Sequence, residues 1–378
     1  MAAQGAFDRI YLGVDGASTV AALVGMRKAL VMASRGFRRR PRHTRVLGKL
    51  ALPPAGIIDA VVPTPGIEDI ANYCSLAEKI SSARVIIAIG GGSVIDAAKL
   101  VASGLAGWAR SPDTIRQFLK AGGRGVGQSR LTVIAVPTTA GTGSEATPFA
   151  TLWDHAKKAK HSIEGSELLP EVAVLDPNLT LNQPIHLTCS SGLDAISQAL
   201  ESWLSPRATS ETDRLAIESL RLSLTALSRL LGREDDLGLR ADMQKSALRA
   251  GQAIAHTRTG LAHAISYPLT ARFGVPHGIA CSFTLPVVWQ RSRGAASDRI
   301  FDLENSLGRG KLEVVLRDLL TTCGVGEQLK RHHFKRRDVL DLAGEMLDPH
   351  RVNNSKLPAT PESVRAIVAE SLDSLGVN

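Results

Sequence analysis

The order of hydrophobic and polar residues divides the chain into two parts with different repeat patterns. In the first half, short apolar runs rich in β-branched residues alternate with segments whose apolar residues recur at helical spacing. Buried parallel strands are typically continuous apolar runs, and crossover helices connect them. This alternation predicts a parallel sheet covered by helices. The expected strands are 29–33, 60–62, 84–89, 131–136 and 172–175, and the expected helices are 67–80 and 94–103.

Beyond residue 182 the β-branched runs disappear and the pattern becomes that of amphipathic helices. Apolar residues recur at i, i+3 and i+4 in long segments, at 189–204, 211–231 and 241–256. We therefore expect an α/β nucleotide-binding domain with a parallel sheet over residues 1–182 and an all-α domain over residues 183–378. A chain of 378 residues is long enough for two such domains.

The charge balance raises the question of nucleic-acid binding. The chain has 45 Lys and Arg against 36 Asp and Glu, a net charge of +9, which favours an anionic partner or ligand. Aromatic residues make up only 4% of the chain, however, so the interleaving of basic and aromatic residues that stacks single-stranded bases is missing. We therefore expect a small anionic ligand and no nucleic acid.

Cysteine usage and the absence of targeting patterns indicate where the protein acts. The four cysteines are widely spaced and form no CxxC pair, so neither a disulfide framework nor a thiolate metal site is expected. No apolar stretch is long enough to span a membrane, and the first residues lack the basic and then apolar pattern of a signal peptide. These features predict a cytoplasmic protein that does not bind membranes.

Two loops rich in small residues directly follow predicted strands. The stretch RVIIAIGGGSVIDAAK at 84–99 leads from a strand through three glycines into a helix, and PTTAGTGSEAT at 137–147 follows the strand 131–136. Glycines let a ligand approach the backbone, and the free N–H groups of a first helical turn attract phosphate. Because ligands bind at the carboxyl ends of parallel strands, both loops would face one site. Tight structural turns are the alternative, and the first loop is not the GxGxxG fingerprint.

A carboxylate, an amide and two imidazoles in the helical half are candidates for a metal site. Asp194 and Gln198 are four residues apart, so both side chains project from one face of a helix. His263 and His277 follow, and a carboxylate with two imidazoles suits a divalent ion. Each histidine taken alone is more simply a hydrogen-bonded core or surface residue, so only the combination indicates a metal.

Taken in order, these motifs resemble the iron-containing (group III) alcohol dehydrogenase family from about residue 8 to the end of the chain. Residues 90–99 resemble its GGGSxxDxAK signature, and residues 137–147 its PTTxGTGSExT loop. The resemblance implies a dehydroquinate synthase-like fold, a homodimer and an NAD(P)-dependent oxidoreductase that interconverts alcohols and aldehydes. The cofactor-binding residues that it implies are Gly91, Gly92, Ser93, Asp96, Thr138, Thr139, Thr147 and Lys160.

The family's metal, usually iron, is held by one aspartate and three histidines, and the second of these ligands differs here. The matching residues are Asp194, Gln198, His263 and His277. An amide oxygen is a weaker ligand than imidazole, which leaves loosely held Fe²⁺, another ion such as Zn²⁺, or no metal as alternatives. The resemblance implies that Asp194, His263 and His277 are catalytic, with the ion polarising an aldehyde carbonyl as hydride arrives in the cleft between the domains. The proton then comes from water or from a neighbouring side chain, for which Tyr267 and Ser266 are the candidates.

Residues 257–270 (TRTGLAHAISYPLT) resemble one branch of the family in particular, whose members reduce phosphonoacetaldehyde to 2-hydroxyethylphosphonate in phosphonate natural-product biosynthesis. Gln198 and residues 147–154 are also similar to that branch. A phosphonate dianion needs a fixed cation, and the planar fork of an arginine suits it, so Arg258 is the substrate-binding candidate. The alternative for Arg258 is a surface residue paired with a carboxylate. The alternatives for the enzyme are a metal-dependent dehydrogenase of a simple alcohol or hydroxy acid, a maleylacetate reductase, or internal redox chemistry as in 3-dehydroquinate synthase.

Cofactor preference is predicted from the end of the strand 29–33. An acidic residue near the end of an early strand usually binds the ribose 2′-OH of NAD. Ser34 stands where the family often has an aspartate, and Arg35 and Arg38 follow it. Without the acid and with these cations nearby, a 2′-phosphate is accepted, so we expect NADPH to be preferred over NADH.

Overall fold

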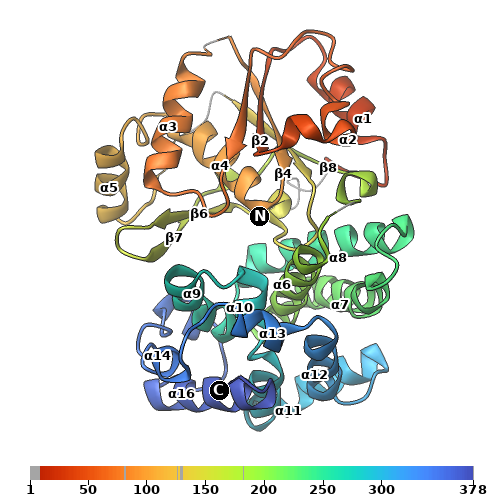
Figure 1. The fold of residues 1–378 in the computed structure, drawn as a ribbon, viewed down its shortest axis with the longest axis vertical. Helices are drawn as coiled ribbons and strands as arrows, with labels where there is room; N and C mark the ends of the chain where they lie inside the picture. The colour runs from red at the N-terminus through yellow and green to blue at the C-terminus, as the bar shows by residue number, and fades with distance from the viewer. Residues whose placement is uncertain (1–8, 81, 126, 128–130, 182, 378) are drawn as a thin grey trace. The chain divides into compact units, whose positions relative to one another are not determined.

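The computed structural model describes residues 9–80, 82–125, 127, 131–181 and 183–377, and the chain forms two compact units (Figure 1). Unit 1 comprises Met1–Thr139 and Gly143–Leu181, and unit 2 comprises Ala140–Thr142 and Asn182–Asn378. Residue 182, the expected end of the first domain, lies outside the described residues. The tip of the Thr/Gly loop, Ala140–Thr142, packs with the helical unit, although we expected it in the first domain.

Unit 1 is built on a six-stranded sheet with the order β1-β8-β5-β4-β2-β3, and every neighbouring pair in it is parallel. The strands are β1 (Ile10–Leu12), β2 (Ala29–Ser34), β3 (Gly56–Val61), β4 (Val85–Gly90), β5 (Thr132–Pro137) and β8 (Val172–Leu175). All six residues of β4 are buried, as expected for a strand covered on both faces. The predicted parallel sheet is confirmed, and β1 is the one strand of the sheet that we did not predict.

Helices lie on both faces of this sheet, because alternate strand residues point to opposite sides. Ile86 and Ala88 of β4 belong to a core shared with α3 (Ile67–Glu78), α4 (Gly92–Gly104) and α5 (Pro112–Lys120). The other strand residues, such as Val85 and Ile87, pack in a second core with α1 (Gly16–Val24). The short helix α2 (Pro41–Thr44) follows the turn after β2.

A two-stranded antiparallel hairpin completes the strands of unit 1 and was not predicted. It pairs β6 (Phe149–Asp154) with β7 (Ala159–Glu164). Only one residue of β7, Ile163, is buried, so the strand has almost no apolar pattern that a sequence could show.

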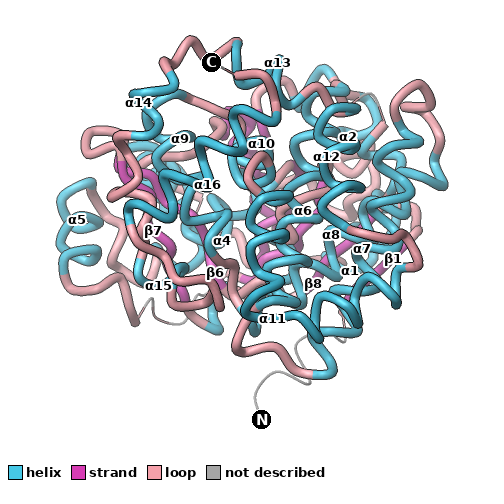
Figure 2. Tube along the Cα trace, turned by 90° about the horizontal axis from the view of Figure 1, so that it is seen from below, coloured by secondary structure: helices cyan, strands magenta, loops and turns pink. Residues whose placement is uncertain are grey.

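Throughout the described part of unit 2, the regular secondary structure is helical, which confirms the expected all-α half (Figure 2). The long helices are α6 (Ile185–Leu204), α7 (Ser210–Leu230), α8 (Leu237–Thr257), α9 (Leu261–Phe273) and α11 (Leu285–Leu307). The shorter ones are α10 (His277–Ser282), α12 (Leu312–Thr322), α13 (Val325–Lys330), α14 (Arg336–Leu340), α15 (Pro349–Val352) and α16 (Pro361–Ser374). Among the described residues, no helix has both the length and the apolar character needed to cross a bilayer.

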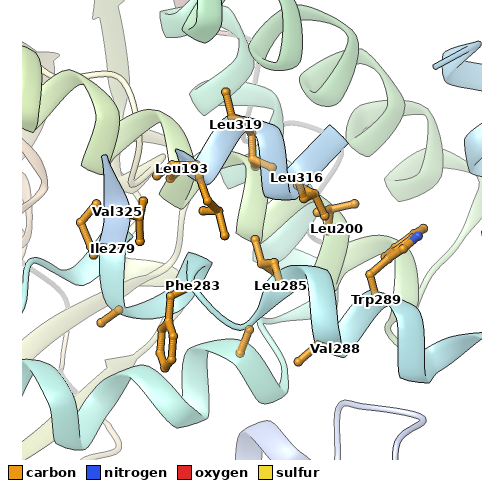
Figure 3. Close-up of a cluster of buried hydrophobic side chains, with 14 of the residues drawn as sticks. Leu193, Leu200, Ile279, Phe283, Leu285, Val288, Trp289, Leu316, Leu319 and Val325 are labelled. Atoms are coloured by element: carbon orange, nitrogen blue, oxygen red, sulfur yellow. The ribbon is translucent and has the colours of Figure 1, made fainter. Parts of the chain in front are cut away.

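The core of unit 2 holds α6 against α10 and so determines where their polar residues meet. Leu193 of α6 and Ile279 of α10 are fully buried members of one hydrophobic cluster (Figure 3). The two backbones approach so closely that a Cβ added at Gly278 would lie 1.7 Å from the carbonyl oxygen of Ser190. Only glycine fits this contact. Asp194, next to Leu193, is thereby brought beside His277, next to Gly278.

Candidate active site

The predicted dinucleotide loop lies at the junction of β4 and α4. Gly91 caps α4 with an extended backbone, and the N–H groups of Val94 and Ile95 donate to its carbonyl oxygen. The preceding N–H groups of a first turn have no intrahelical partner and are available to an anion. Gly91, Gly92 and Ser93 are all half-buried here, and the Ser93 hydroxyl accepts a hydrogen bond from the Thr64 N–H at 3.2 Å. This turn fits a pyrophosphate.

Lys99, which sequence reasoning did not single out, joins this helix to the second loop. Its side chain is 1% exposed, and its ammonium donates to the Ser144 hydroxyl and to the carbonyl oxygens of Thr147 and Phe149 at 2.9–3.0 Å. Burial lowers the pKa of Lys99 to about 8, against the raising effect of the nearby Asp96 and Glu145 carboxylates. Burial likewise raises the pKa of Glu145 to about 7, although the Lys99 charge acts to lower it. The DxAK spacing was the available signal.

Two of the predicted cofactor residues use their side chains inside unit 1. The Asp96 carboxylate accepts hydrogen bonds from the Ser144 hydroxyl at 2.5 Å and from the Thr151 N–H at 2.9 Å. The Thr147 hydroxyl lies 3.3 Å from the Lys99 ammonium. Both side chains are therefore engaged in contacts within unit 1, although the resemblance implies that these residues bind the cofactor.

The remaining cofactor candidates lie at strand ends and on the hairpin. Thr138 is buried and its N–H donates to the Gly90 carbonyl oxygen, while Thr139 is half-buried. Lys160 is half-buried on β7, opposite Trp153. Ser34 ends β2 and is half-buried, and the neighbouring Arg35 is exposed. Arg38 forms an ion pair with Asp59 of β3.

In unit 2 the structure brings together Asp194, His263 and His277, three of the four metal-ligand candidates, and places Cys281 beside them. One ligand atom from each of these four residues lies within 4.8 Å of all the others. Ligands of a tetrahedral ion with bonds of about 2.0–2.3 Å lie about 3.3–3.8 Å apart, so the four atoms would draw closer together by about 1 Å on binding an ion. Cys281 follows His277 by one helical turn on α10. We had expected no cysteine at a metal site; the spacing of His277 and Cys281 was the missed signal.

Glu201, also unforeseen, orients His263. Its carboxylate accepts hydrogen bonds from the Nδ1 of His263 at 2.5 Å and from the Ala262 N–H at 2.7 Å. The Nε2 of His263 then faces Asp194 Oδ1 at 3.4 Å and is the nitrogen free to bind an ion. A carboxylate behind a ligand histidine fixes its ring and makes it a stronger ligand.

The electrostatics of this cluster favour a cation. Burial opposes charge on His263, but Glu201 and Asp194 outweigh it and raise the His263 pKa to about 9. Burial acts to raise the pKa of Asp194, yet the two histidines and Gln198 lower it to about 2. Two buried carboxylates therefore demand positive charge beside them, which a proton or a metal ion supplies.

Gln198 points its amide nitrogen, rather than its oxygen, at the aspartate. Nε2 donates to Asp194 Oδ1 at 3.1 Å and to the Thr142 carbonyl oxygen at 3.3 Å. These two acceptors settle which end of the amide is nitrogen. The amide oxygen is buried and has no hydrogen-bond partner among the described residues. Such an orphaned oxygen fits a cluster that receives a cation.

The candidate proton donors and Arg258, the candidate for substrate binding, lie on or beside α9. The Tyr267 ring is half-buried and stacks near the ring of His277, with centroids 6.3 Å apart. The Ser266 hydroxyl donates to the His263 carbonyl oxygen at 2.7 Å, so its proton is used within the helix. Arg258 is half-buried between α8 and α9, with φ 68° and ψ 172°. This conformation is rare for residues other than glycine and tends to occur at functional sites.

A parallel-sheet unit with a glycine-rich turn between strand and helix, together with a helical unit that carries a carboxylate–imidazole cluster, is typical of an oxidoreductase that uses a nicotinamide cofactor. The family model described as "Iron-containing alcohol dehydrogenase" matches residues 8–177. The model described as "Fe-containing alcohol dehydrogenase family, C-terminal" matches residues 188–372. The chain therefore belongs to the iron-containing alcohol dehydrogenase family, and the predicted family, fold and NAD(P)-dependent oxidoreductase class are confirmed.

Relatives of this chain are named for several different enzymes. It is 39% identical to the phosphonoacetaldehyde reductase of Streptomyces viridochromogenes over 254 residues. The aligned region covers 66% of this chain and 63% of that protein. It is 32% identical to a probable alcohol dehydrogenase, EutG, of Escherichia coli, over 81% of this chain and 77% of that protein. The structure of a sulfoacetaldehyde reductase from Bifidobacterium kashiwanohense in complex with NAD⁺ superposes with a TM-score of 0.87 and 25% identity, covering 96% of both chains.

Proposed function

We propose that this chain uses NADPH to reduce a small aldehyde that carries an anionic group, namely phosphonoacetaldehyde, to its alcohol, 2-hydroxyethylphosphonate. The observation that supports the proposal is the backbone of Arg258, which is half-buried at the end of α8 with φ 68°, a conformation that tends to occur at functional sites. Arg258 lies two residues before Gly260, where an added Cβ would lie 3.3 Å from the Glu201 carboxylate that orients His263. The relatives named for phosphonoacetaldehyde and sulfoacetaldehyde act on two-carbon aldehydes with an anionic end, which supports the same substrate class.

In this proposal the cofactor, the ion and the side chains around them have separate roles. When bound, NADPH supplies hydride for the carbonyl carbon, and a divalent ion, Fe²⁺ or Zn²⁺, supplies Lewis-acid polarisation. The turn at Gly91–Ser93 binds the cofactor pyrophosphate, and Asp194, His263 and His277 hold the ion. Arg258 orients the phosphonate, and Tyr267 supplies the proton that the product oxygen needs.

A simple aldehyde is the second candidate substrate. The EutG relative spans more of this chain than the phosphonoacetaldehyde reductase does, at 32% identity. The 1-propanol dehydrogenase PduQ of Salmonella typhimurium, also 32% identical, covers 82% of this chain. An enzyme of that kind needs no cation for its substrate, so Arg258 would then have another role.

Substrate profiling separates the two candidates. The assay follows oxidation of NADPH and of NADH with phosphonoacetaldehyde, acetaldehyde, propanal and maleylacetate, each with and without added Fe²⁺ or Zn²⁺. A kcat/KM highest for phosphonoacetaldehyde supports the proposal. A higher value for acetaldehyde or propanal leaves family membership intact and overturns the phosphonate assignment.

Replacing Arg258 with alanine tests the substrate contact. We expect KM for phosphonoacetaldehyde to rise about 10- to 100-fold, since a charge-assisted hydrogen bond contributes about 1.5–3 kcal/mol. KM for propanal should change less than about twofold, because propanal forms no ion pair. For Arg258→Lys, KM for phosphonoacetaldehyde should lie between the values of the unmodified enzyme and of Arg258→Ala. The control is Arg207→Ala, at an exposed arginine of the same unit. Equal effects on both aldehydes would remove Arg258 from the substrate site.

Replacing Ser34 with aspartate tests the cofactor preference. A carboxylate at the end of β2 can accept a hydrogen bond from the ribose 2′-OH and repels a 2′-phosphate. We expect the ratio of kcat/KM for NADPH over NADH to fall at least about tenfold, which corresponds to about 1.4 kcal/mol. Ser34→Ala is the control and should leave the ratio nearly unchanged. Comparable use of both cofactors by the unmodified enzyme would contradict the prediction at the outset.

We further propose a cytoplasmic homodimer. The family resemblance supports the dimer, and four buried cysteines without disulfides support a reducing compartment. The molar mass of the purified protein in solution tests the dimer directly.

A further inference from the structure

We propose that the Cys281 thiolate is a metal ligand and completes a set with Asp194, His263 and His277. This inference rests on the metal role in the proposed function and adds to it a ligand that the family's aspartate and three histidines do not include. It also assigns the chemical class of ion: a borderline-soft ion such as Zn²⁺ or Co²⁺ in preference to Fe²⁺.

The position of Cys281 supports this role. It is fully buried, and its sulfur lies 3.7 Å from Asp194 Oδ1, the carboxylate oxygen that also faces His263 Nε2 at 3.4 Å. His277 and Cys281 project from the same face of α10 because they are four residues apart. The close approach of Gly278 to the Ser190 backbone holds α10 against α6, and Leu193 and Ile279 belong to one buried hydrophobic cluster, so the sulfur lies in a tightly packed part of unit 2.

Gln198 is less suited to be the fourth strong ligand. Its amide nitrogen, which cannot bind a cation, is the atom that contacts Asp194 Oδ1. Its buried oxygen lacks a hydrogen-bond partner among the described residues and is independent support for a cation at the cluster. A neutral amide oxygen still binds a divalent ion more weakly than a thiolate does. In this inference the sulfur, on α10, is the fourth ligand in place of the histidine that the family has at position 198 on α6.

A thiolate ligand changes the chemistry of the site in a defined way. The ion forms a bond to the sulfur as the S–H bond breaks, and the proton leaves to solvent, so no electrons are exchanged. Thiolate ligands select Zn²⁺ and other softer ions over Fe²⁺. We therefore expect the purified chain to retain zinc in preference to iron.

Cobalt substitution tests the ligand without relying on turnover. The full-length protein is stripped of metal and titrated with Co²⁺, and the near-ultraviolet absorption is recorded, where a sulfur-to-cobalt charge-transfer band reports a thiolate ligand. Cys281→Ser and Cys281→Ala are compared with Cys74→Ser, which alters a buried cysteine of the other unit. Gln198→Ala is the fourth variant. Turnover of phosphonoacetaldehyde is measured separately.

We expect the band at one Co²⁺ per chain in the unmodified protein, in Cys74→Ser and in Gln198→Ala. Both Cys281 variants should lose the band, and Cys281→Ser should bind Co²⁺ at least about tenfold more weakly. Stoichiometric Co²⁺ binding without the band, or a band that persists in Cys281→Ser, overturns the cysteine ligand and leaves the proposed function standing. Failure of the unmodified chain to bind Co²⁺ overturns the inference, and turnover by that metal-free protein then removes the metal from the proposed function as well.

Discussion

Replacing His263 with alanine should lower kcat for the aldehyde at least about a thousandfold and remove the bound metal. The expected size follows from losing Lewis-acid polarisation, which is worth several kcal/mol where charge develops on the carbonyl oxygen. His263 Nε2 is the nitrogen that faces Asp194, and its other nitrogen is held by Glu201, so no neighbouring group replaces it. Steady-state kinetics and metal content of the purified variant measure the two losses.

Controls separate this effect from a general loss of structure. His277→Ala should reproduce both losses, since His277 contributes to the same cluster. His256→Ala, at an exposed histidine near the end of α8, should change neither. Thermal unfolding of each variant shows whether the protein still folds. Full activity in a thoroughly demetallated enzyme would refute the metal role and with it this prediction.

Glu201 provides a second, graded test of the same site. Glu201 accepts from His263 Nδ1 with Oε2 and from the Ala262 N–H with Oε1, so Glu201→Gln keeps one acceptor, replaces the other with an amide donor and removes the negative charge behind the imidazole. As a positioning residue it should weaken metal binding about 10- to 100-fold, the usual effect of losing a carboxylate behind a ligand histidine. The readouts are the metal dissociation constant and its dependence on pH. A substitution on α6 that only disturbed the structure would not change both together.

The sequence predicted the elements whose burial leaves a local pattern. β4 is apolar along its whole length because helices cover both faces of the sheet, and the predicted segments 189–204, 211–231 and 241–256 correspond to α6, α7 and α8. β1 is only three residues long, and β7 buries a single residue, so neither carries enough pattern to be recognised. Their positions depend on pairing with β8 and β6, which is information from distant parts of the chain.

The residues of the candidate site also fall into those that the sequence predicted and those that it did not. Asp194, His263 and His277 were identified as a set because they occur in recognisable motifs, and the structure brings them together. Glu201 was missed because its contact with His263 comes from the packing of α6 against α9, which no spacing in the sequence records, and Cys281 was missed although it follows His277 by one helical turn. Lys99 was missed for a related reason. A lysine on a helix is normally exposed, and this one is buried only because the loop after β5 folds over it.

Replacing Lys99 with methionine should destabilise the protein by about 3–5 kcal/mol near pH 8. Methionine fills a similar volume, but the carbonyl oxygens of Thr147 and Phe149 lose their donor, and the buried Glu145 loses the positive charge near it. Lys79→Met, at an exposed lysine of the same unit, should change stability by less than about 0.5 kcal/mol. Urea unfolding of the three proteins measures the difference.

The loss should also depend on pH, because the pKa of Glu145 is raised by burial to about 7 from its ordinary value near 4.5. A carboxyl whose pKa is raised in the folded state contributes stability at low pH, and this contribution is lost as the pH rises through the folded pKa. At pH 6 Glu145 is mostly neutral and needs no cation, so Lys99→Met should cost clearly less than at pH 8. Adding Glu145→Gln to Lys99→Met should remove this difference between the two pH values. If the single and double variants lose the same stability at both pH values, Lys99 acts through its hydrogen bonds alone, and its charge has no part in holding the loop after β5.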